Sequence, residues 1–202
     1  HQMSRSPSLP LPRPRSLLAG TAAALVLAAC APMVPRETAN AAARPLMPAF
    51  QLDGRMSATD GRQGASGRVE WEHAPQTDRL TLLSPLGQIV ARLDSGPDGA
   101  RLLSADGTQR DAPSADALLP EVLGIEVPSA RLPRWVQGAP EAGAQIRERD
   151  ALGRPQLVID QGWRIDYLAY ADDRPEALPA RLDISRGDAR IRLIIDSWTA
   201  LP

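Results

Sequence analysis

The sequence predicts a mainly β fold, in which a curved antiparallel sheet is interrupted once by a short pair of helices. Apolar and polar residues alternate with a period of two in several segments after Phe50, which is typical of strands with one apolar and one solvent-facing side. Turn signals built from glycine, proline and aspartate separate these segments, so successive strands are expected to pair as hairpins. Residues 114–137 have helical spacing of apolar side chains instead.

Residues 1–29 have the layout of a secretory signal peptide. Arg13 and Arg15 precede the apolar run 17–26, and small residues follow directly before the only cysteine. A basic segment, a short apolar segment and a small-residue cleavage site are the three parts of such a signal. The apolar run is too short to span a bilayer as a helix. We therefore expect these residues to be removed, and we expect the two residues before Met3 to be an extension.

The cysteine, Cys30, directly follows Leu-Ala-Ala. This arrangement resembles a lipoprotein box, in which the cysteine becomes the first mature residue and carries three acyl chains. Three chains of about 16 carbons favour the membrane by on the order of 35 kcal/mol, so spontaneous escape to water is negligible. The alternative is an ordinary cleaved signal with an incidental cysteine. Residues 31–48 contain four prolines and no strand pattern, so residues 30–48 are expected to be a lipidated N-terminus and flexible tether before a domain at 49–202.

The alternating segments define the predicted sheet. In one of them, Ile89, Ala91 and Leu93 alternate with polar residues and are expected on the apolar side. Tight turns such as Asp106-Gly107 lie between the segments, and about ten short strands are expected. The segments with the clearest alternation are 68–72, 89–94, 164–167, 181–184 and 190–195.

Residues 114–137 are expected to form two short helices. In the first, four apolar residues at i, i+1, i+4 and i+5 share one face, and Gly124 ends the helix. Ser114 or Asp116 is expected to cap its N-terminus. Pro120 lies within it and is expected to shorten or kink it. The four apolar residues are Leu118, Leu119, Val122 and Leu123.

The second helix is expected to start at Pro128 and end at Gly138, with Pro133 near its first turn. A sheet with one apolar face must bury that face. Two helices of about ten residues cover only part of a sheet of this size, because each is only about 15 Å long. The remainder must close on itself as a barrel or enclose a space for an apolar guest.

One predicted turn has an apolar residue at its tip. Ser84, Pro85 and Gly87 fit positions i, i+1 and i+3 of a type I turn, which places Leu86 where polar residues are usual. One interpretation is an apolar finger for a membrane surface or a lipid. The other is a leucine folded back over its own hairpin, since single exposed leucines are common.

From about Phe50 to Trp198 the chain resembles the LolB family, the outer-membrane lipoproteins that receive other lipoproteins from the periplasmic carrier LolA. The order and spacing of the matching motifs are more specific than any one of them. These motifs are Gly54-Arg55, Trp71, 80–87, 105–107, Leu123-Gly124, Val127-Pro128, 132–138, 162–165, Tyr167, 179–182 and 195–198.

The resemblance implies a fold and a function. The fold would be an incomplete antiparallel β-barrel, closed by a helical lid around an apolar cavity. Such a protein binds the acyl chains of a lipoprotein in the cavity and inserts the cargo into the inner leaflet of the outer membrane, without a nucleotide. The family's membrane-insertion loop falls on Leu86, between Pro85 and Gly87. Ala31, where aspartate would signal retention in the inner membrane, fits delivery to the outer membrane.

The resemblance also suggests residues that line the cavity or form the lid. For each of them, ordinary core packing is the alternative to contact with cargo. The candidates are Trp71, Leu118, Leu119, Val122, Leu123, Leu132 and Trp135. Trp163 and Trp198 have the same two interpretations.

Composition argues against several other classes. Residues 1–29 carry three arginines and no acidic residue, so their removal changes the formal charge from -1 to -4, which argues against a nucleic-acid partner. One cysteine allows neither an intrachain disulfide nor a cysteine-based metal site. His73, the only histidine of the mature chain, is expected at the surface beside the turn at Ala74-Pro75, and no Ser/His/Asp triad is possible without it. Asp172-Asp173 lacks metal-ligand spacing.

We therefore expect a monomeric protein that is not an enzyme and has no metal or cofactor. Its expected partners are a LolA-like carrier, acylated lipoproteins and the outer membrane. Two alternatives stay open at this stage. One is an envelope lipoprotein that binds lipids or glycolipids in general, and the other is a structural lipoprotein without a ligand. A periplasmic hydrolase has no catalytic constellation in its favour.

Overall fold

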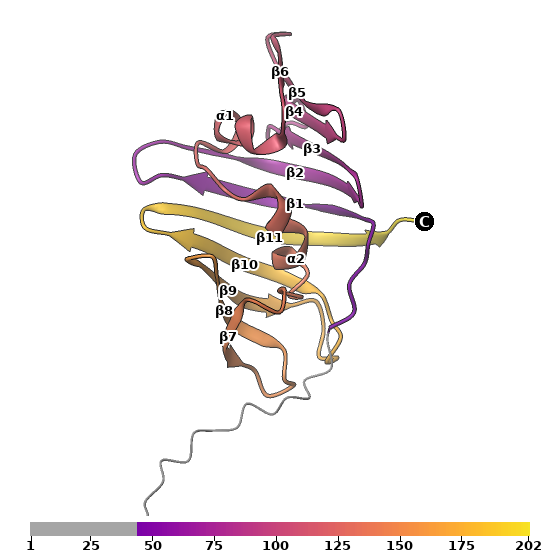
Figure 1. Cartoon of the computed structure of the whole chain (residues 1–202), viewed down its shortest axis with the longest axis vertical. Coiled ribbons are helices and arrows are strands. Elements are labelled where there is room, and N and C mark those ends of the chain that lie inside the picture. The colour runs from indigo at the N-terminus through magenta and orange to yellow at the C-terminus, as the bar shows by residue number, and fades with distance from the viewer. Residues whose placement is uncertain (1–43) are drawn as a thin grey trace, which may run out of the picture. The chain divides into compact units, whose positions relative to one another are not determined.

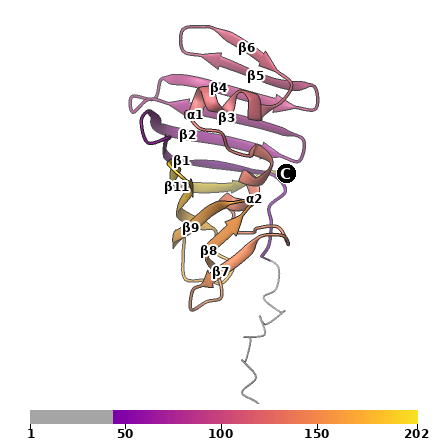
Figure 2. The same ribbon diagram turned by 60° about the vertical axis from the view of Figure 1, so that its left-hand side comes forward.

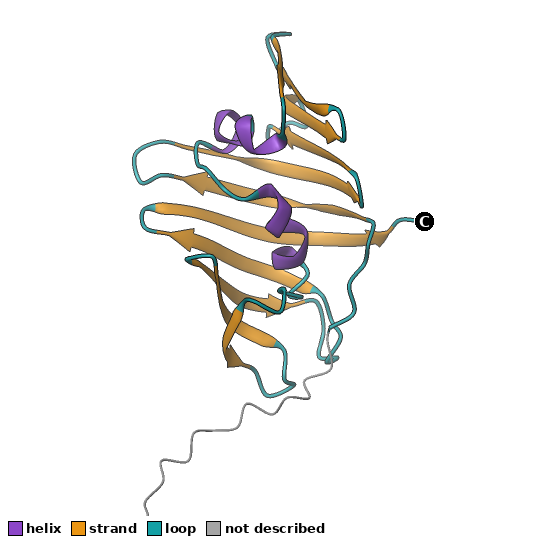
Figure 3. Cartoon of the chain, viewed as in Figure 1, coloured by secondary structure: helices purple, strands orange, loops and turns teal. Residues whose placement is uncertain are grey.

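The computed structural model describes residues 44–202, which belong to a compact unit that spans Asn40–Pro202. The expected signal peptide, Cys30 and residues 31–43 of the expected tether lie outside the described residues. The described chain is dominated by strands (Figures 1 and 3). These are β1 (Phe50–Thr59), β2 (Gly64–Ala74), β3 (Thr77–Leu83), β4 (Ile89–Gly96), β5 (Gly99–Ser104), β6 (Gln109–Ala112), β7 (Gln145–Arg149), β8 (Pro155–Asp160), β9 (Trp163–Tyr170), β10 (Pro179–Arg186) and β11 (Ala189–Ala200).

All eleven strands form one antiparallel sheet in the order β6-β5-β4-β3-β2-β1-β11-β10-β9-β8-β7. Every neighbouring pair is a hairpin of consecutive strands, except for β1 with β11 in the middle of the sheet. The edges are β6 and β7, although these two are consecutive in the chain. The sheet therefore stays open where pairing of β6 with β7 would close a barrel, which confirms the predicted incomplete antiparallel barrel.

The chain between the two edge strands forms the lid, which we define as residues 114–138. It contains the helices α1 (Leu119–Leu123) and α2 (Leu132–Val136), each preceded by a short 3₁₀ turn. Figures 1 and 2 show both helices on the same side of the sheet, with α2 lying across the strands in the middle of the sheet. None of the helices within residues 44–202 is long and apolar enough to cross a membrane.

The glycine and the prolines set the length of the helices as predicted. Gly124 ends α1 with a φ of +73°, and its N–H donates to the carbonyl of Pro120. Pro120 and Pro133 each lie in the first turn of a five-residue helix, where a missing N–H costs little. Each helix is thus shorter than the sequence pattern alone indicated.

The predicted N-terminal cap is wrong. Ser114 precedes the first 3₁₀ turn but makes no capping hydrogen bond with its side chain. Asp116 accepts a hydrogen bond of 2.8 Å from the N–H of Ser129, which lies thirteen residues further along the chain. The carboxylate therefore joins the two helical segments of the lid, because the fold brings the N–H of Ser129 within hydrogen-bonding distance of it.

The apolar core lies between the sheet and the lid. Alternate residues of each strand point to this inner side, as Phe50, Leu52, Met56 and Ala58 do on β1. Strands β2 to β5, strands β8 to β11 and both helices contribute to the same cluster, while the edge strands β6 and β7 pack against it only through the partly buried Ala112 and Ile146. The largest fully buried side chains in it are Trp135, Trp163, Phe50, Leu52, Ile165, Leu182 and Ile184.

One strand departs from the predicted alternation. Leu82 pairs with Ala91 and Leu83 pairs with Ile89, so Val90 is an extra residue at a β-bulge. Ala91 and Leu93 point into the core as predicted, but Ile89 is 44% exposed. The prediction for Ile89 is therefore wrong, because a bulge changes which side of the sheet the residues before it face.

Candidate functional site

The lid covers the sheet with an apolar surface. Leu118, Leu119, Val122 and Leu123 are all buried and belong to the core cluster. Trp135 of α2 is fully buried in the same cluster, and Leu132 is half-buried against it. These side chains pack with the inner side of the sheet in one apolar cluster. Whether cargo contacts them remains a prediction.

The α2 half of the lid (residues 128–138) is fixed by buried hydrogen bonds. The indole N–H of Trp135 donates to Asp160 Oδ2 at 2.8 Å, and the hydroxyl of Tyr167 donates to the carbonyl of Trp135 at 2.6 Å. All three side chains are buried. Burial raises the pKa of Tyr167 far above its usual range. The hydroxyl therefore stays protonated and able to donate.

Asp160 also forms an ion pair with Arg131, which lies in the lid directly before α2. Arg131 lies 3.7 Å from Asp160 Oδ2 and 2.6 Å from Glu141 Oε2. The carboxylate of Asp160 is thus paired with a guanidinium as well as with the indole of Trp135, although it is buried. A buried charge needs such partners, because an unpaired one costs several kcal/mol.

Gln137, at the end of α2, ties the lid to the segment that precedes β1. Its side chain is fully buried, accepts a hydrogen bond from Met47 N–H at 2.8 Å and donates to the carbonyls of Met47 and Pro133. Arg44, in the same segment, donates to the carbonyls of Pro175 and Ala177. The last residues before the sheet therefore lie against the domain.

Tyr170 anchors the same side of the molecule. The guanidinium groups of Arg44 and Arg154 lie 5.2 and 4.2 Å from the centre of its ring. Its hydroxyl donates to the carbonyl of Pro155. Burial raises the pKa of Tyr170 to about 12, against the opposing effect of the nearby arginines.

The α1 half of the lid (residues 114–127) is held in a different way. Its contact with the sheet is the apolar face already described, and its ionic contact is the exposed pair of Arg110 and Glu121. An exposed ion pair contributes little to stability. Asp116 connects this half to the second segment at Ser129. The α1 half therefore depends mainly on apolar packing.

The turn between β3 and β4 has the predicted form. Gly87 N–H donates to the carbonyl of Ser84 at 2.8 Å, and Gly87 has a φ of +81°. Leu86 is 88% exposed at its tip, so the leucine does not fold back over its own hairpin.

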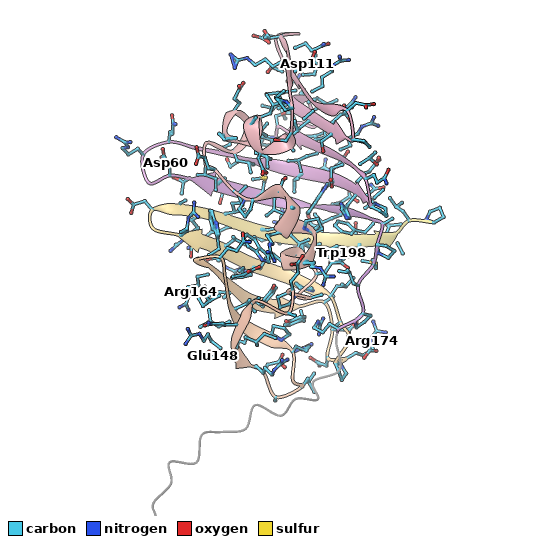
Figure 4. The ribbon with its side chains drawn as sticks, viewed as in Figure 1. Asp60, Asp111, Glu148, Arg164, Arg174 and Trp198 are labelled. Atoms are coloured by element: carbon cyan, nitrogen blue, oxygen red, sulfur yellow. The ribbon has the colours of Figure 1, made fainter. Side chains whose placement is uncertain are left out.

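Leu86 lies at a defined end of the sheet, which we call the Leu86 end. The strand directions place five turns there, and Figure 4 labels Asp60 in one of them. The other four turns at this end have charged or small polar residues at their tips. The five turns are 60–63, 84–88, 105–108, 161–162 and 187–188.

Two of the aromatic residues singled out in the sequence lie at the opposite end. Trp71 is buried, and its indole N–H donates to Asp78 Oδ1 at 2.8 Å. His73 Nδ1 lies 2.7 Å from the same oxygen, and its ring packs 5.1 Å from that of Phe50. The expectation of a surface position for His73 is wrong, because the aromatic side chains around Phe50 half-bury it.

The structure adds residues that the sequence pattern did not single out for this site. Asp160 and Gln137 fix the lid, and their partners lie 25 and 90 residues away in the chain. In the sequence, the available signal was a charged or amide side chain among apolar residues. Such a signal indicates a buried polar contact but does not identify the residue that makes the hydrogen bond. Among residues 44–202, no group of three or more His, Cys, Asp or Glu side chains is placed to hold a metal ion.

Within residues 44–202, fold and site together define a domain with an open antiparallel sheet, an apolar interior under a helical lid and an exposed apolar turn. The family model described as "Outer membrane lipoprotein LolB" matches residues 48–198. The chain therefore belongs to the LolB family.

The matched relatives agree with this assignment over most of their length. "Outer-membrane lipoprotein LolB" of Azoarcus sp. (strain BH72) is 57% identical over 179 residues, which cover 89% of this chain and 92% of that protein. Proteins of the same name from Dechloromonas aromatica and Thiobacillus denitrificans are each 38% identical, over 76% and 89% of this chain and 83% and 95% of their own. A structural likeness with a TM-score of 0.47 and 9% identity covers 79% of this chain and 89% of a LolA superfamily protein from Nitrosomonas europaea. The family assignment rests on the sequence matches.

Proposed function

We propose that this protein accepts lipoproteins from a LolA-like periplasmic carrier, holds their acyl chains under the lid and inserts them into the outer membrane. The observation that carries this proposal is the match to relatives named outer-membrane lipoprotein LolB over nearly the whole folded domain. The lid over an apolar interior and the exposed leucine support it, because they supply a place for acyl chains and a contact for a membrane.

Anchoring follows from the N-terminal sequence. Residues 1–29 are the signal peptide, Cys30 carries the acyl chains, and residues 30–48 connect them to the domain at 49–202. Acylation at this position holds the protein at the inner leaflet of the outer membrane, facing the periplasm. We propose that it works there as a monomer.

In this proposal, the acyl chains take the place of the α1 side chains on the inner side of the sheet and do not require a preformed cavity. The inner side of the sheet is covered by leucine and valine side chains of α1, and these are chemically equivalent to the methylene groups of a lipid. Cargo that displaces the α1 half therefore restores the apolar contact that it breaks, so uptake requires no nucleotide.

The test of uptake uses the chain from Ala31 onward, which keeps the whole compact unit. It is mixed with a carrier preloaded with a lipoprotein, in the absence of ATP, and recovered by affinity. We expect the lipoprotein to be recovered with it. A folded domain that takes up a hydrophobic dye but no lipoprotein would indicate a general lipid carrier instead. A domain that takes up neither would indicate a structural lipoprotein.

The test of delivery changes the turn. We expect Leu86→Glu to keep the fold and the uptake of cargo, because the side chain is exposed. Delivery from the loaded protein to vesicles should fall about tenfold or more, since burying a leucine is worth about 1.5–3 kcal/mol. Leu152→Glu is the matched control, because Leu152 is an exposed leucine in the turn between β7 and β8. Normal delivery by Leu86→Glu would contradict the role of the turn.

A further inference from the structure

We propose that Leu86 is the tip of a larger membrane-docking surface that continues onto the outer side of β4 and β5. This docking surface consists of Leu86, Ile89, Val90 and Leu103. The proposal rests on the proposed delivery of cargo to a membrane and specifies how the domain lies on that membrane. Contact through the strands as well as the turn would hold the domain in one orientation.

The bulge in β4 creates the first part of this surface. Regular alternation along a strand turns one of two consecutive residues to the inner side. Ile89 and Val90 are instead 44% and 42% exposed. The reason is the β-bulge, because Leu83 pairs with Ile89 and Leu82 pairs with Ala91, which leaves Val90 without a paired residue on β3. Two consecutive β-branched apolar residues thus face solvent directly after the exposed turn.

The neighbouring strand extends the surface. Leu103 of β5 is 41% exposed and pairs with Arg92, two residues beyond Val90 on β4. The N–H of Ala105 donates to the carbonyl of Val90 at 2.9 Å, which keeps the two strands together up to the turn. The register therefore places Leu103 beside Val90 on the outer side of the sheet.

The apolar character is confined to the Leu86 end. Further along the same strands the outer side is ionic, with Arg79 2.6 Å from Asp94 and Arg101 2.8 Å from Asp111 on β6. A group of exposed apolar residues next to a protruding turn marks an interaction site, whereas scattered ones do not.

The other half of the sheet is polar at the same end. On the outer side of β9 to β11, Arg164 lies 2.7 Å from Asp166, and Arg192 lies 3.4 Å from Asp183. The turns that follow β8 and β10 have Gln161-Gly162 and Gly187-Asp188 at their tips. The molecule therefore presents one apolar corner at this end, and that corner is in the β3–β5 region.

The chemistry of the corner fits a phospholipid surface. Arg68 pairs with Leu83, and Arg92 pairs with Leu103, so both arginines border the docking surface. Neither forms an ion pair within residues 44–202. Guanidinium groups bind phosphate well, and apolar residues bordered by them match the acyl and phosphate layers of a bilayer. Asp106, in the adjacent turn, accepts a hydrogen bond from Thr108 N–H.

The first experiment measures binding to vesicles of phosphatidylethanolamine and phosphatidylglycerol. It uses the chain from Ala31 onward, which lacks the acylated cysteine. The test variant is the triple substitution Ile89→Thr, Val90→Thr, Leu103→Thr, with Leu86 intact. We expect its affinity for the vesicles to be lower than that of the parent by about tenfold or more. Threonine keeps the β-branched shape that suits a strand. The matched control is Leu168→Thr, Ile194→Thr, since these residues are 52% and 37% exposed on the outer side of the other half.

The second experiment locates the contact. Because Cys30 is the only cysteine, the chain from Ala31 onward has none, and single cysteines can be introduced and labelled with an environment-sensitive nitrobenzoxadiazole dye. Labels at Leu86→Cys and Leu103→Cys should shift to shorter emission wavelengths on addition of vesicles, whereas a label at Leu168→Cys should not.

Several results would overturn the proposal. A triple variant that is folded and binds vesicles like the parent would show that the strands do not contact lipid, as would a label that shifts at position 86 but not at 103. Unchanged vesicle binding with loss of carrier binding would assign the surface to the carrier protein. These results are independent of cargo uptake, because a protein that accepts no lipoprotein still gives a measurable vesicle affinity.

Discussion

The two halves of the lid are held on the sheet by different forces. The α2 half is fixed by directional contacts, which include the indole of Trp135 on Asp160, the hydroxyl of Tyr167 on the lid backbone and the amide of Gln137 on Met47. The α1 half is fixed mainly by six buried aliphatic side chains, which are Leu118, Leu119, Val122, Leu123, Ile125 and Val127. Buried hydrogen bonds have specific partners, and a lipid cannot replace them. Aliphatic contacts are not directional, so an acyl chain can replace them.

This difference identifies the part of the lid that moves in the proposed mechanism. Displacing the α2 half would leave buried polar groups without partners, each at a cost of about 1–3 kcal/mol. Displacing the α1 half exposes apolar surface that incoming cargo then covers. Residues 124–127, at the end of the α1 half, connect α1 to the α2 half. We therefore infer that α1 opens about this connection while α2 stays in place.

The largest effect is expected from the centre of the fixed half. Trp135→Ala should reduce the free energy of unfolding by about 3–5 kcal/mol, because it removes a fully buried indole. Denaturation in urea measures this value. Trp135→Phe is the control that keeps an aromatic ring but removes the N–H donor to Asp160, with an expected loss of about 1–3 kcal/mol. A loss below about 1 kcal/mol for Trp135→Ala would show that α2 is not fixed.

A smaller effect is expected at alkaline pH. The folded protein holds the pKa of Tyr170 at about 12, above its ordinary value of 10.0, so the unfolded chain loses this proton first. The stability from this tyrosine is complete below pH 10 and is lost as the pH rises from about 10 to 12. Unfolding free energies measured across this range should fall, and less steeply in Tyr170→Phe. Equal slopes in the two proteins would contradict the assignment.

The smallest effect is expected in local opening. Amide hydrogen exchange should be about tenfold or more faster at Gly124, which ends α1, than at Ala139, which follows α2. Both amides donate to carbonyls within their own helical segment, to Pro120 and Arg134 respectively. Two-dimensional NMR in deuterated buffer resolves the two rates. Equal protection would mean that the lid opens as one unit, and the distinction between its halves would be lost.

Local patterns in the sequence predicted much of the fold. Alternation in segments such as 164–167 and 181–184 identified strands and their apolar side, because this period is a property of one chain segment. Gly124 and Gly87 marked a helix end and a turn, since both positions need a positive φ. The motif that contains Leu86 identified the exposed tip. These features depend on residues that are neighbours in the chain.

The tertiary structure decided the features that depend on distant partners. Ile89 faces solvent because the pairing of β3 with β4 contains a bulge, which the alternation of β4 alone does not reveal. Asp116 binds Ser129 rather than capping its own segment, and Asp160 binds Trp135 of the lid. Sequence periodicity fixes which residues of a segment share a face. The register between segments, and hence the fixed half of the lid and the extent of the exposed apolar corner, is set only when separate parts of the chain pack together.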